Sequence, residues 1–457
     1  MKPGVVLELN DQNIFLMQDF LKYSAVVAAT LTITVATSLA QVDIISIDSL
    51  GLQQAVAIAL EHHPALQAAQ ANLHSAEASK KLALSSYYPA ISATGTGTHT
   101  EGYFVFNPSI PSRYQIYSNY VAGFNGTQLI YDFGKTSSRV GANTDFVEAS
   151  EEDLRSTHDN VVMNVQLAYF ALLAQRSVVT VNEEAVQQAT SHLAQARAFY
   201  TVGRRPQFDV TRAEVDLANA NVNLISARNA LEVARVQLDN AMGIHPVHPY
   251  VLTDSLGTAP VSLKLDSVVA IAAQQRPDLL SAKARLSGFR GLVSAARSQH
   301  LPTLSANGSY NWSGFNLQFQ NGIGGLYPRW IAGLTFTLPI FQGFSINAQV
   351  EQAEASVEGA QANLSTLTQG ALLEVQQAYL GVIEAQERMG AAAKLVEQAE
   401  QNLNLAERQY AAGVGTPLDV TDAQLTRSNA RITHIQALYD YNSSLARLQK
   451  AIGMVPK

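Results

Sequence analysis

Few side chains in this sequence could do chemistry, and they form no known catalytic pattern. Four of the ten histidines lie next to prolines, in the segments that contain His62, His63, His245 and His248. Such histidines more often end a helix or lie in a turn than bind a metal ion. The chain has no cysteine, which excludes disulfides, thiolate nucleophiles and cysteine-bound metals. Because no zinc-protease, serine-hydrolase or phosphate-binding motif occurs either, we expect no catalytic residue, no metal site and no cofactor.

Aspartates recur at two matching interruptions of otherwise helical sequence. Residues 200–210 read YTVGRRPQFDV and residues 410–420 read YAAGVGTPLDV, so Tyr, Gly, Asp and Val recur in the same order. Glycine and proline cost about 1 and 3 kcal/mol in a helix interior, so both segments predict a turn between helices. Asp209 and Asp419 follow one turn after each break, and Asp422 lies three residues further on. Helix capping is an alternative explanation for the first two, but less so for Asp422, which lies beyond the first turn.

The composition argues against a nucleic-acid partner. The 457 residues carry a net charge of −7, charged side chains make up 15%, and basic residues form only short pairs such as Arg204 and Arg205. A nucleic-acid surface needs a larger basic patch, so we expect none. A charged fraction below the usual level of about 25% instead suits long helices that pack through small side chains.

Residues 1–40 are predicted to be a signal peptide. Lys22 precedes an uncharged apolar run over residues 25–39, and Ser38 and Ala40 place small side chains at a cleavage site before Gln41. The run is short for a membrane span, which needs about 20 residues, although a single-span anchor is the alternative. The acidic residues before Met17 make a poor start for a signal peptide, so Met17 is an alternative first residue. In either case we expect the protein to leave the cytoplasm.

The rest of the chain is a tandem repeat. The offset of the two interruptions also pairs Val165-Gln166 with Val375-Gln376 and Gly243 with Gly453, and further upstream His63-Pro64 pairs with Arg276-Pro277. Self-similarity over such a distance indicates a duplicated structural unit. We therefore expect a first repeat over 41–246, a linker over 247–264 and a second repeat over 265–457. Each repeat is predicted to contain a helix, two strands, a long helix and a returning helix.

Two segments, residues 89–131 and 302–341, are predicted to be β-hairpins because apolar and polar residues alternate in them. Trp330, Leu334 and Phe336 share one face of the last strand, for example. We expect strands of about ten residues with aromatic ends, and charges almost confined to the loops, at Glu101, Arg113 and Arg329. In an exported protein this pattern predicts the wall of a membrane β-barrel, whereas a soluble sandwich would need more strands. Four strands cannot close a barrel, so the chain must oligomerise.

The helices after each hairpin are exceptionally long. Nothing interrupts residues 136–202, which predicts about 100 Å of helix at 1.5 Å per residue. Apolar residues recur every seven positions in both repeats, at Val165, Leu172, Val179, Val186, Leu193 and Tyr200, and at Val375, Val382, Met389, Val396, Leu403 and Tyr410. Such heptads predict coiled-coil packing along the whole length. The interruptions are then the tips of two helical hairpins, near 203–206 and 413–417.

This ordered set of features resembles the TolC-type outer-membrane efflux protein family. The resemblance rests on the signal peptide, the duplicated hairpin and coiled coil, the two tip sequences, and the segments 130–134 (IYDFG) and 338–344 (LPIFQGF) at the strand-to-helix passages. It implies an α+β membrane protein in the outer membrane of a Gram-negative bacterium. Three copies would form a twelve-stranded barrel that continues into the periplasm as a tube of twelve helices. It also implies that a periplasmic adaptor docks on the tips and that an inner-membrane pump, proton-driven or of ABC type, supplies the energy.

The resemblance also assigns roles to the tip residues. The family has aspartates at its periplasmic constriction, and Asp209, Asp419 and Asp422 match them, with Tyr410 nearby. A ring of aspartate carboxylates at a constriction selects cations, and its charge depends on pH. Relatives keep a tip-closing arginine where this chain has Gly415. We therefore expect closure through Arg204 or Arg205, or through Tyr410 and hydrogen bonds; the alternative is that both arginines are simply solvated. Adaptor docking is expected at Val202, Gly203, Ala412 and Gly413.

The predicted function is that of a passive outer-membrane exit duct for small toxic compounds. A duct for secreted polypeptides, working with an ABC transporter in type I secretion, is the alternative within the same class. A periplasmic coiled-coil scaffold that forms no channel is the alternative from another class, but it does not explain the two-faced strands. An exported enzyme explains neither the strands nor the heptads.

Overall fold

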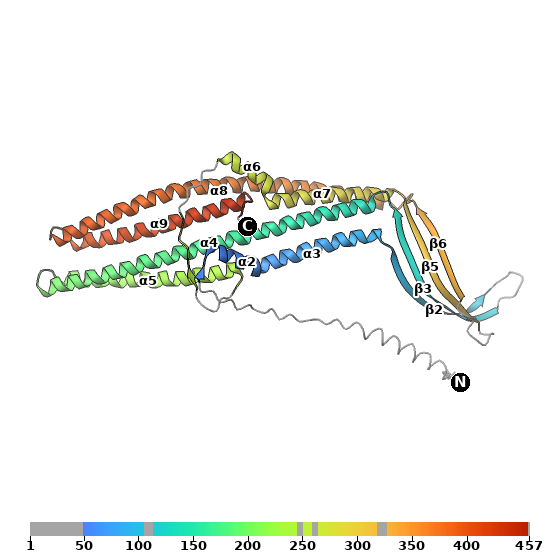
Figure 1. Ribbon diagram of the computed structural model, residues 1–457, viewed down its shortest axis with the longest axis horizontal. Helices are drawn as coiled ribbons and strands as arrows, with labels where there is room; N and C mark the ends of the chain where they lie inside the picture. The colour runs from blue at the N-terminus through green and yellow to red at the C-terminus, as the bar shows by residue number, and fades with distance from the viewer. Residues whose placement is uncertain (1–48, 105–112, 245–249, 258–263, 318–326, 456–457) are drawn as a thin grey trace, which may run out of the picture. The chain divides into compact units, whose positions relative to one another are not determined.

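The computed structural model describes residues 49–104, 113–244, 250–257, 264–317 and 327–455 (Figure 1). The chain separates into two units, Met1–Ile44 and Ile45–Lys457, and the description below concerns the second. The predicted signal peptide, together with His245 and His248, lies outside the described residues.

Both repeats contain the same elements in the same order. The first contains α2 (Leu52–His62), α3 (Pro64–Leu84), β2 (Ala90–Phe104), β3 (Arg113–Tyr131), α4 (Lys135–Thr201) and α5 (Gln207–Met242). The second contains α6 (Leu265–Gln275), α7 (Pro277–Arg297), β5 (Thr303–Leu317), β6 (Tyr327–Thr337), α8 (Ser345–Ala411) and α9 (Pro417–Ala451). Two short strands, β1 (Ser49–Leu50) and β4 (Val251–Leu252), pair in parallel between the repeats.

The single helix expected at the start of each repeat is in fact two helices. Pro64 and Pro277 each begin a new helix, because proline cannot supply the N–H that a helix interior needs. His63 caps α3, where its Nδ1 accepts a hydrogen bond of 3.1 Å from the Ala65 N–H. In the second repeat the matching Arg276 is buried and donates to Asp278 and Glu374, each at 2.7 Å. The prolines therefore mark junctions, and His63 acts as a helix cap.

The four long strands form one antiparallel sheet in the order β2-β3-β5-β6. They contain 15, 19, 15 and 11 residues, so the expected length of about ten was too short. The expectation that charges lie in the loops was also wrong, since Glu101 and Arg329 lie within β2 and β6 and Arg113 begins β3. The reason is that strand pairing continues through the polar ends, where Arg329 is paired with Asn311.

The register of the sheet separates an apolar face from a polar one. Phe124, Tyr310 and Trp330 lie side by side across three strands, with Ala122 and Trp312 on the same face. On the opposite face, side-chain hydrogen bonds join Asn125 to Thr94 at 2.9 Å and Asn307 to Thr335 at 2.7 Å. No element of the described chain covers the apolar face, and Trp330 is 74% exposed. The sheet is therefore not half of a sandwich within one chain.

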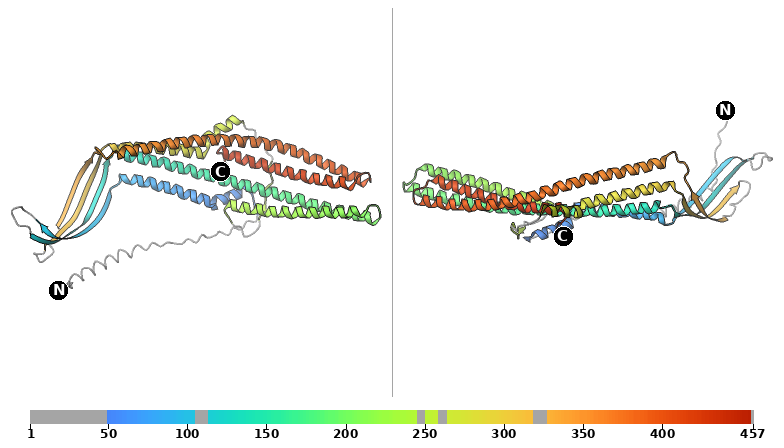
Figure 2. Two further views of the ribbon diagram at one scale, coloured as in Figure 1. Left: turned by 180° about the vertical axis from the view of Figure 1, so that it is seen from behind. Right: turned by 90° about the horizontal axis from the view of Figure 1, so that it is seen from above.

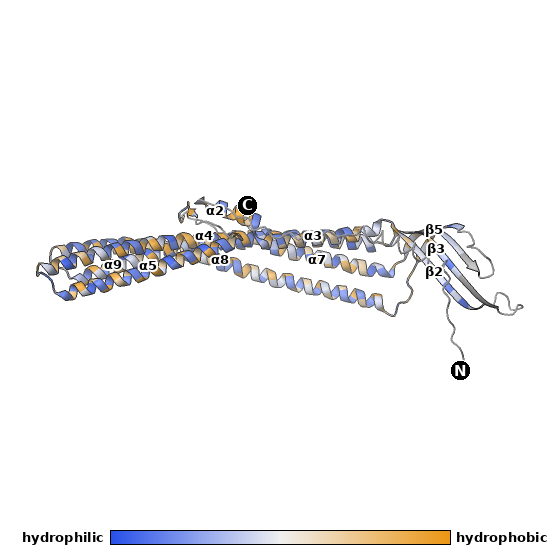
Figure 3. Cartoon of the chain, turned by 90° about the horizontal axis from the view of Figure 1, so that it is seen from below, coloured by the Kyte–Doolittle hydropathy of each residue, from blue (hydrophilic) through white to orange (hydrophobic). Residues whose placement is uncertain are grey.

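The long helices pack as two hairpins that run side by side (Figure 2). α4 packs against α5 in the first hairpin, α8 packs against α9 in the second, and α4 contacts α9 between them. Apolar residues recur along each long helix instead of forming one continuous apolar segment (Figure 3). Among the described residues, no helix combines the length and the apolar character that crossing a membrane would require.

The heptad seams are buried as predicted over most of their length. Val165 and Leu172 in α4, and Val375 and Val382 in α8, are buried. The tyrosines that end the two seams differ, since Tyr410 is 6% exposed and Tyr200 is 45% exposed. The expectation that both lie in a buried seam was therefore wrong for Tyr200. The physical reason is that Tyr410 has the end of α4 beside it, whereas Tyr200 contacts no equivalent neighbour in the described chain.

A candidate constriction at the helical tips

Each helical hairpin reverses within five residues, which we call the first tip (residues 202–206) and the second tip (residues 412–416). Gly203 and Gly413 have φ angles of +74° and +82°, a left-handed conformation that glycine adopts without strain. In the first tip the Gly203 and Arg204 N–H groups donate to carbonyl groups at the end of α4, both at 2.9 Å. The backbone of each tip is therefore a compact helix end.

The residues predicted to dock an adaptor are exposed. A Cβ added at Gly203 or Gly413 would meet no atom within 4 Å, and Val202 and Ala412 are also exposed. Val414, which the sequence prediction missed, is the most exposed apolar residue of either tip. Its position between two glycines was a signal that could have identified it. Both tips therefore present apolar side chains and accessible backbone to a partner.

The three predicted constriction aspartates are in different environments. Asp419 forms a capping box, in which one carboxylate oxygen accepts from the Thr416 N–H at 2.8 Å and from its hydroxyl at 2.7 Å. These bonds hold the pKa of Asp419 below its ordinary value. The pattern Thr-x-x-Asp at 416–419 is a capping signal that the sequence prediction overlooked. Asp419 therefore caps α9, whatever else it does.

The side chains of Asp209 and Asp422 form no such capping hydrogen bonds within the described residues. Asp422 is exposed, and its carboxylate forms no hydrogen bond or ion pair within the described residues. In Asp209 the backbone N–H donates to the Pro206 carbonyl at 3.1 Å, but one carboxylate oxygen is buried and has no hydrogen-bond partner in the described part of the chain. Asp209 belongs to the first hairpin and Asp422 to the second, and no contact found among the described residues joins them.

Tyr410 joins the two tips within one chain. Its ring lies 6.3 Å from the ring of Phe199 and 6.1 Å from that of His192, both in α4. The guanidinium carbon of Arg205 lies 5.4 Å from the centre of the Tyr410 ring, a cation–π contact from the first tip. Burial raises the pKa of the Tyr410 hydroxyl, while the positive charge of Arg205 opposes the shift and Asp209 adds to it.

The structure thus brings Arg205 and Tyr410 together, but it leaves Arg204 exposed. Residue 415, where relatives keep the tip-closing arginine, is a glycine here and has no side chain that could close the tip. A Cβ at residue 415 would lie 3.0 Å from the Tyr410 nitrogen and 3.1 Å from the Gln409 carbonyl carbon. A long side chain would require this turn to shift, so the cation near Tyr410 comes from the other hairpin.

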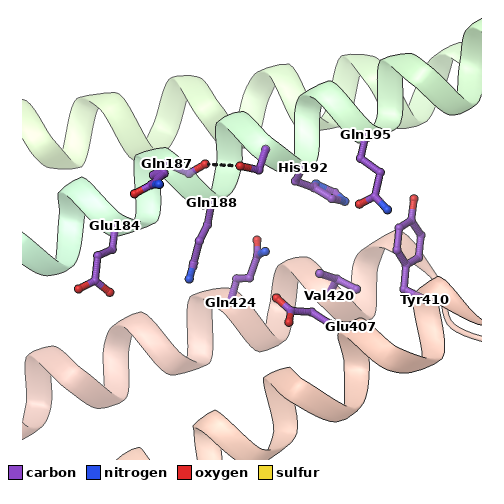
Figure 4. Close-up of a pocket in the computed structure, with 10 residues that line it drawn as sticks. Glu184, Gln187, Gln188, His192, Gln195, Glu407, Tyr410, Val420 and Gln424 are labelled. Carbon is purple, nitrogen blue, oxygen red and sulfur yellow. Dashed lines mark hydrogen bonds between the residues drawn. The ribbon is translucent and has the colours of Figure 1, made fainter.

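His192, in α4 about three turns before the first tip, is a residue that the sequence prediction missed. It is buried, its Nε2 has no hydrogen-bond partner among the described residues, and it lines a cleft of about 540 Å³ together with Tyr410, Glu184 and Glu407 (Figure 4). Burial lowers the pKa of His192, and the carboxylates of Asp216 and Asp209 oppose this shift. The only sequence signal was its place beside Leu193 of the heptad seam.

Charged residues also join the two hairpins. Glu184 in α4 accepts hydrogen bonds from Arg431 in α9, one of them at 3.2 Å, and lies 3.8 Å from Arg427. The hydrogen bonds from Arg431 hold the pKa of Glu184 below its ordinary value. Nearby, the Thr421 hydroxyl donates to Asp216 at 3.4 Å. The contact between the hairpins therefore combines one buried aromatic cluster with a set of ion pairs.

The fold and the tips together define a class of protein. A sheet with an uncovered apolar face suits lipid, and the coiled-coil hairpins built on α4 and α8, each of 67 residues or about 100 Å, suit water. These are the parts of a membrane channel that continues as a tunnel. Residues 55–244 and 268–454 match the sequence profile of the family described as outer membrane efflux protein, and the chain belongs to that family.

Known relatives agree with this assignment. The probable efflux pump outer membrane protein TtgC of Pseudomonas putida is 26% identical over 419 residues, which cover 88% of this chain and 82% of the relative. The outer membrane protein TolC of Escherichia coli is 24% identical over 338 residues, or 72% of this chain and 68% of the relative. The solved structure of the outer membrane protein VceC from Vibrio cholerae superposes with a TM-score of 0.73 at 21% identity, covering 88% of this chain and 96% of VceC.

Several predictions from the sequence are confirmed by these comparisons. The chain is an outer-membrane efflux protein of α+β tandem-repeat fold, and its family contains channels, not enzymes. It serves as an outer-membrane exit duct, which excludes the alternative of a scaffold without a channel.

Proposed function

We propose that the chain forms a homotrimer, in which three sheets close one twelve-stranded barrel and three pairs of hairpins close a tube of twelve helices. The observation that carries this proposal is the open sheet, because β2 and β6 are both edge strands. Unpaired backbone groups are too costly to leave in lipid, so each edge needs a partner from another copy. The number three comes from the family resemblance.

The outermost helices support the same assembly. α5 exposes Phe208, Val215, Val222 and Val236, which are spaced by seven or fourteen residues, and Val222 is 61% exposed. α8 exposes Leu373, Leu380 and Leu405. Exposed heptad positions on a helix that is already packed on its other side favour a neighbouring helix from a second copy.

The trimer is tested by placing a charge on the exposed seam of α5. We expect Val222→Glu to prevent assembly, because a carboxylate would be buried without a partner. Asn223→Glu, at the next exposed position of the same helix, is the matched control and should assemble normally. The mass in neutral detergent, measured by light scattering, should be three times that of one mature chain for the unmodified protein and for the control. If the unmodified protein had the mass of a single chain, the proposal would be refuted.

We further propose that the duct is passive and receives small toxic compounds from an inner-membrane pump through a periplasmic adaptor at the tips. The exposed backbone at Gly203 and Gly413 supports docking at this point. The relative in Pseudomonas putida is named as part of an efflux pump, which favours small compounds over secreted polypeptides. Outer-membrane lipid would contact the apolar face of the sheet.

Docking is tested with Gly413→Trp, which should abolish complementation of drug sensitivity in a strain that lacks the channel. The trimer should remain intact, because the tip lies at the surface and an added Cβ meets no atom within 4 Å. Gly413→Ala, which has the same left-handed strain without the bulk, is the control for backbone strain. Gly390→Trp, at an open position within α8, is the control for bulk alone. Retained export by Gly413→Trp would contradict the proposal, and restored secretion of a polypeptide without drug export would favour type I secretion.

We also propose that Asp209, Asp419 and Asp422 line the narrowest part of the tube and that the contact of Arg205 with Tyr410 helps to close it. Asp422 is the best supported, since it is exposed and unpaired within the described residues. Asp422→Asn should reduce the preference for cations in planar bilayers.

Arg205→Ala should raise the conductance, because the cation–π contact contributes about 0.5–1 kcal/mol. Arg204→Ala is its control, and equal effects of the two substitutions would contradict the role of Arg205.

A further inference from the structure

We propose that a cleft between α3 and α4, far from the tips, binds an amphipathic organic cation with Asp159 as its charge partner. The cleft has a volume of about 1080 Å³ and lies where the residues after α9 reach α4. At that point Arg155 donates to the Gly453 carbonyl at 3.5 Å. This inference does not rest on the function proposed above, because it concerns a separate place in the same chain.

The walls of the cleft combine apolar and polar side chains. The apolar ones come from α2, α3, α4 and the segment after α9, namely Leu60, Leu66, Ala71, Leu154 and Val455, and polar ones such as Gln67, Gln70 and His74 lie among them. Small-molecule sites are typically clefts of about 300–1,000 Å³ with apolar walls and a few placed polar groups. The size and the lining therefore suit a ligand with an apolar or aromatic body.

Asp159 supplies the polar group. It is 6% exposed, and one carboxylate oxygen lies 3.1 Å from His158 Nδ1. The other oxygen, Oδ2, is buried and has no hydrogen-bond partner in the described part of the chain. A buried carboxylate oxygen without a partner is unfavourable, so a donor on a ligand would remove that cost. The residue lines the cleft, and a rotation of its side chain would present this oxygen to such a donor.

The remaining charges favour a cation over an anion. Glu61 and Glu151 also line the cleft, and neither forms an ion pair within the described residues. Arg155, which lines the same cleft, already lies 3.5 Å from Glu152. Among the described residues, no group of three His, Asp or Glu side chains is placed to hold a metal ion. An organic cation fits this arrangement better, because it needs one charge partner and an apolar surface.

The probe for the test is ethidium, a fluorescent aromatic cation, added to the full chain in neutral detergent and followed by fluorescence anisotropy. We expect Asp159→Asn to weaken its binding about tenfold or more, because a hydrogen bond to a charged group is lost. Asp145→Asn is the matched control: it removes the same charge from the same helix, about 20 Å away along α4, outside the cleft. Fluorescein, an aromatic anion, should bind at least tenfold more weakly than ethidium.

A second variant keeps the test decisive if Asp159→Asn does not assemble. Ala71→Phe fills the cleft from the exposed side of α3, and it should abolish ethidium binding without altering assembly. Because the chain has no cysteine, Ala71→Cys gives a single thiol whose labelling in the assembled protein reports access to the cleft. Ethidium should slow this labelling.

The proposal is overturned by any of three results: ethidium binding that Asp159→Asn leaves unchanged, binding that survives Ala71→Phe, or equal binding of fluorescein. A thiol at position 71 that resists labelling in the assembled protein would also overturn it, since another copy of the chain would then fill the cleft.

Discussion

Tyr200 and Tyr410 occupy matching positions in the two repeats, yet only Tyr410 joins the hairpins. Phe199, His192 and Arg205 all contact Tyr410 from the first hairpin. The duplicated chain therefore uses one copy of the tyrosine as a contact between its halves and leaves the other on the surface. At the residue scale, the tip is asymmetric although the sequence repeat is regular.

His192 makes this contact sensitive to pH. Burial holds its pKa below the ordinary value of about 6.5, so the neutral ring is the form that fits between the hairpins. Its contribution to stability is present above about pH 6.5 and is lost as the pH falls toward the lowered pKa. We expect the protection factors of the amide hydrogens at the end of α4, which correct for the intrinsic pH dependence of exchange, to be several-fold lower at about pH 5.5 than at about pH 7.5.

Two variants test the role of His192. His192→Gln should show the same protection factors at both pH values, because glutamine does not titrate, whereas His74→Gln on the exposed side of α3 should behave like the unmodified chain. The acidic groups that face His192 are Asp209, Asp216, Glu184 and Glu407. A pH effect that persists in His192→Gln would assign the sensitivity to those carboxylates.

At the scale of elements, two glycines allow the returning helices to approach the helix junctions. Gly243 ends α5 and packs on His63, and a Cβ there would lie 2.9 Å from the His63 Cα. Gly453 follows α9 and packs on the junction of α6 and α7, where a Cβ would lie 2.7 Å from the Gln275 carbonyl oxygen. Both have φ angles near +70°, at +72° and +71°. The repeat thus conserves a close backbone contact in each half of this chain.

Gly453→Ala should therefore destabilise the protein by more than about 1–2 kcal/mol. The substitution combines a left-handed conformation with a clash against a backbone atom, which cannot move away cheaply. Gly390→Ala, within α8 and with nothing within 4 Å, is the matched control and should be neutral or stabilising by up to about 1 kcal/mol. Urea unfolding of the full chain in neutral detergent, followed by circular dichroism, measures both. Equal midpoints for the two variants would show that the junction tolerates a side chain.

The elements themselves could be predicted from the sequence, because each has a local cause. Heptads in α4 and α8, alternation in β5 and β6, and glycines at both tips are periodic or conformational signals. The environments of Tyr410 and His192 could not be predicted in the same way. They depend on the contact between α4 and the second hairpin, which no local pattern encodes. The capping role of Asp419 was predictable from Thr416, but it was weighed only as one alternative.

At the scale of the whole molecule, we propose that the two hairpins of a chain move relative to each other when the tube opens. Glu184 joins α4 to Arg431 across the hairpins, whereas the adjacent Glu183 joins α4 to Arg228 of α5, at 2.9 Å, within one hairpin. Glu183 and Glu184 both have a carboxylate, but Glu183 pairs within one hairpin and Glu184 pairs between the two hairpins. Substituting each in turn therefore distinguishes the stability of a hairpin from the contact between hairpins.

Glu184→Gln should raise the open fraction of the channel, and Glu183→Gln should not. Partly exposed ion pairs contribute about 0.2–1 kcal/mol, so the expected change in the ratio of open to closed channels is up to about fivefold. Single-channel recordings of the assembled protein in planar bilayers measure this ratio directly. The effect should shrink as salt is raised, because exposed charges are screened. If both substitutions raised the open fraction equally, loss of negative charge on α4 would explain the result, and the pairing of Glu184 with Arg431 would not control opening.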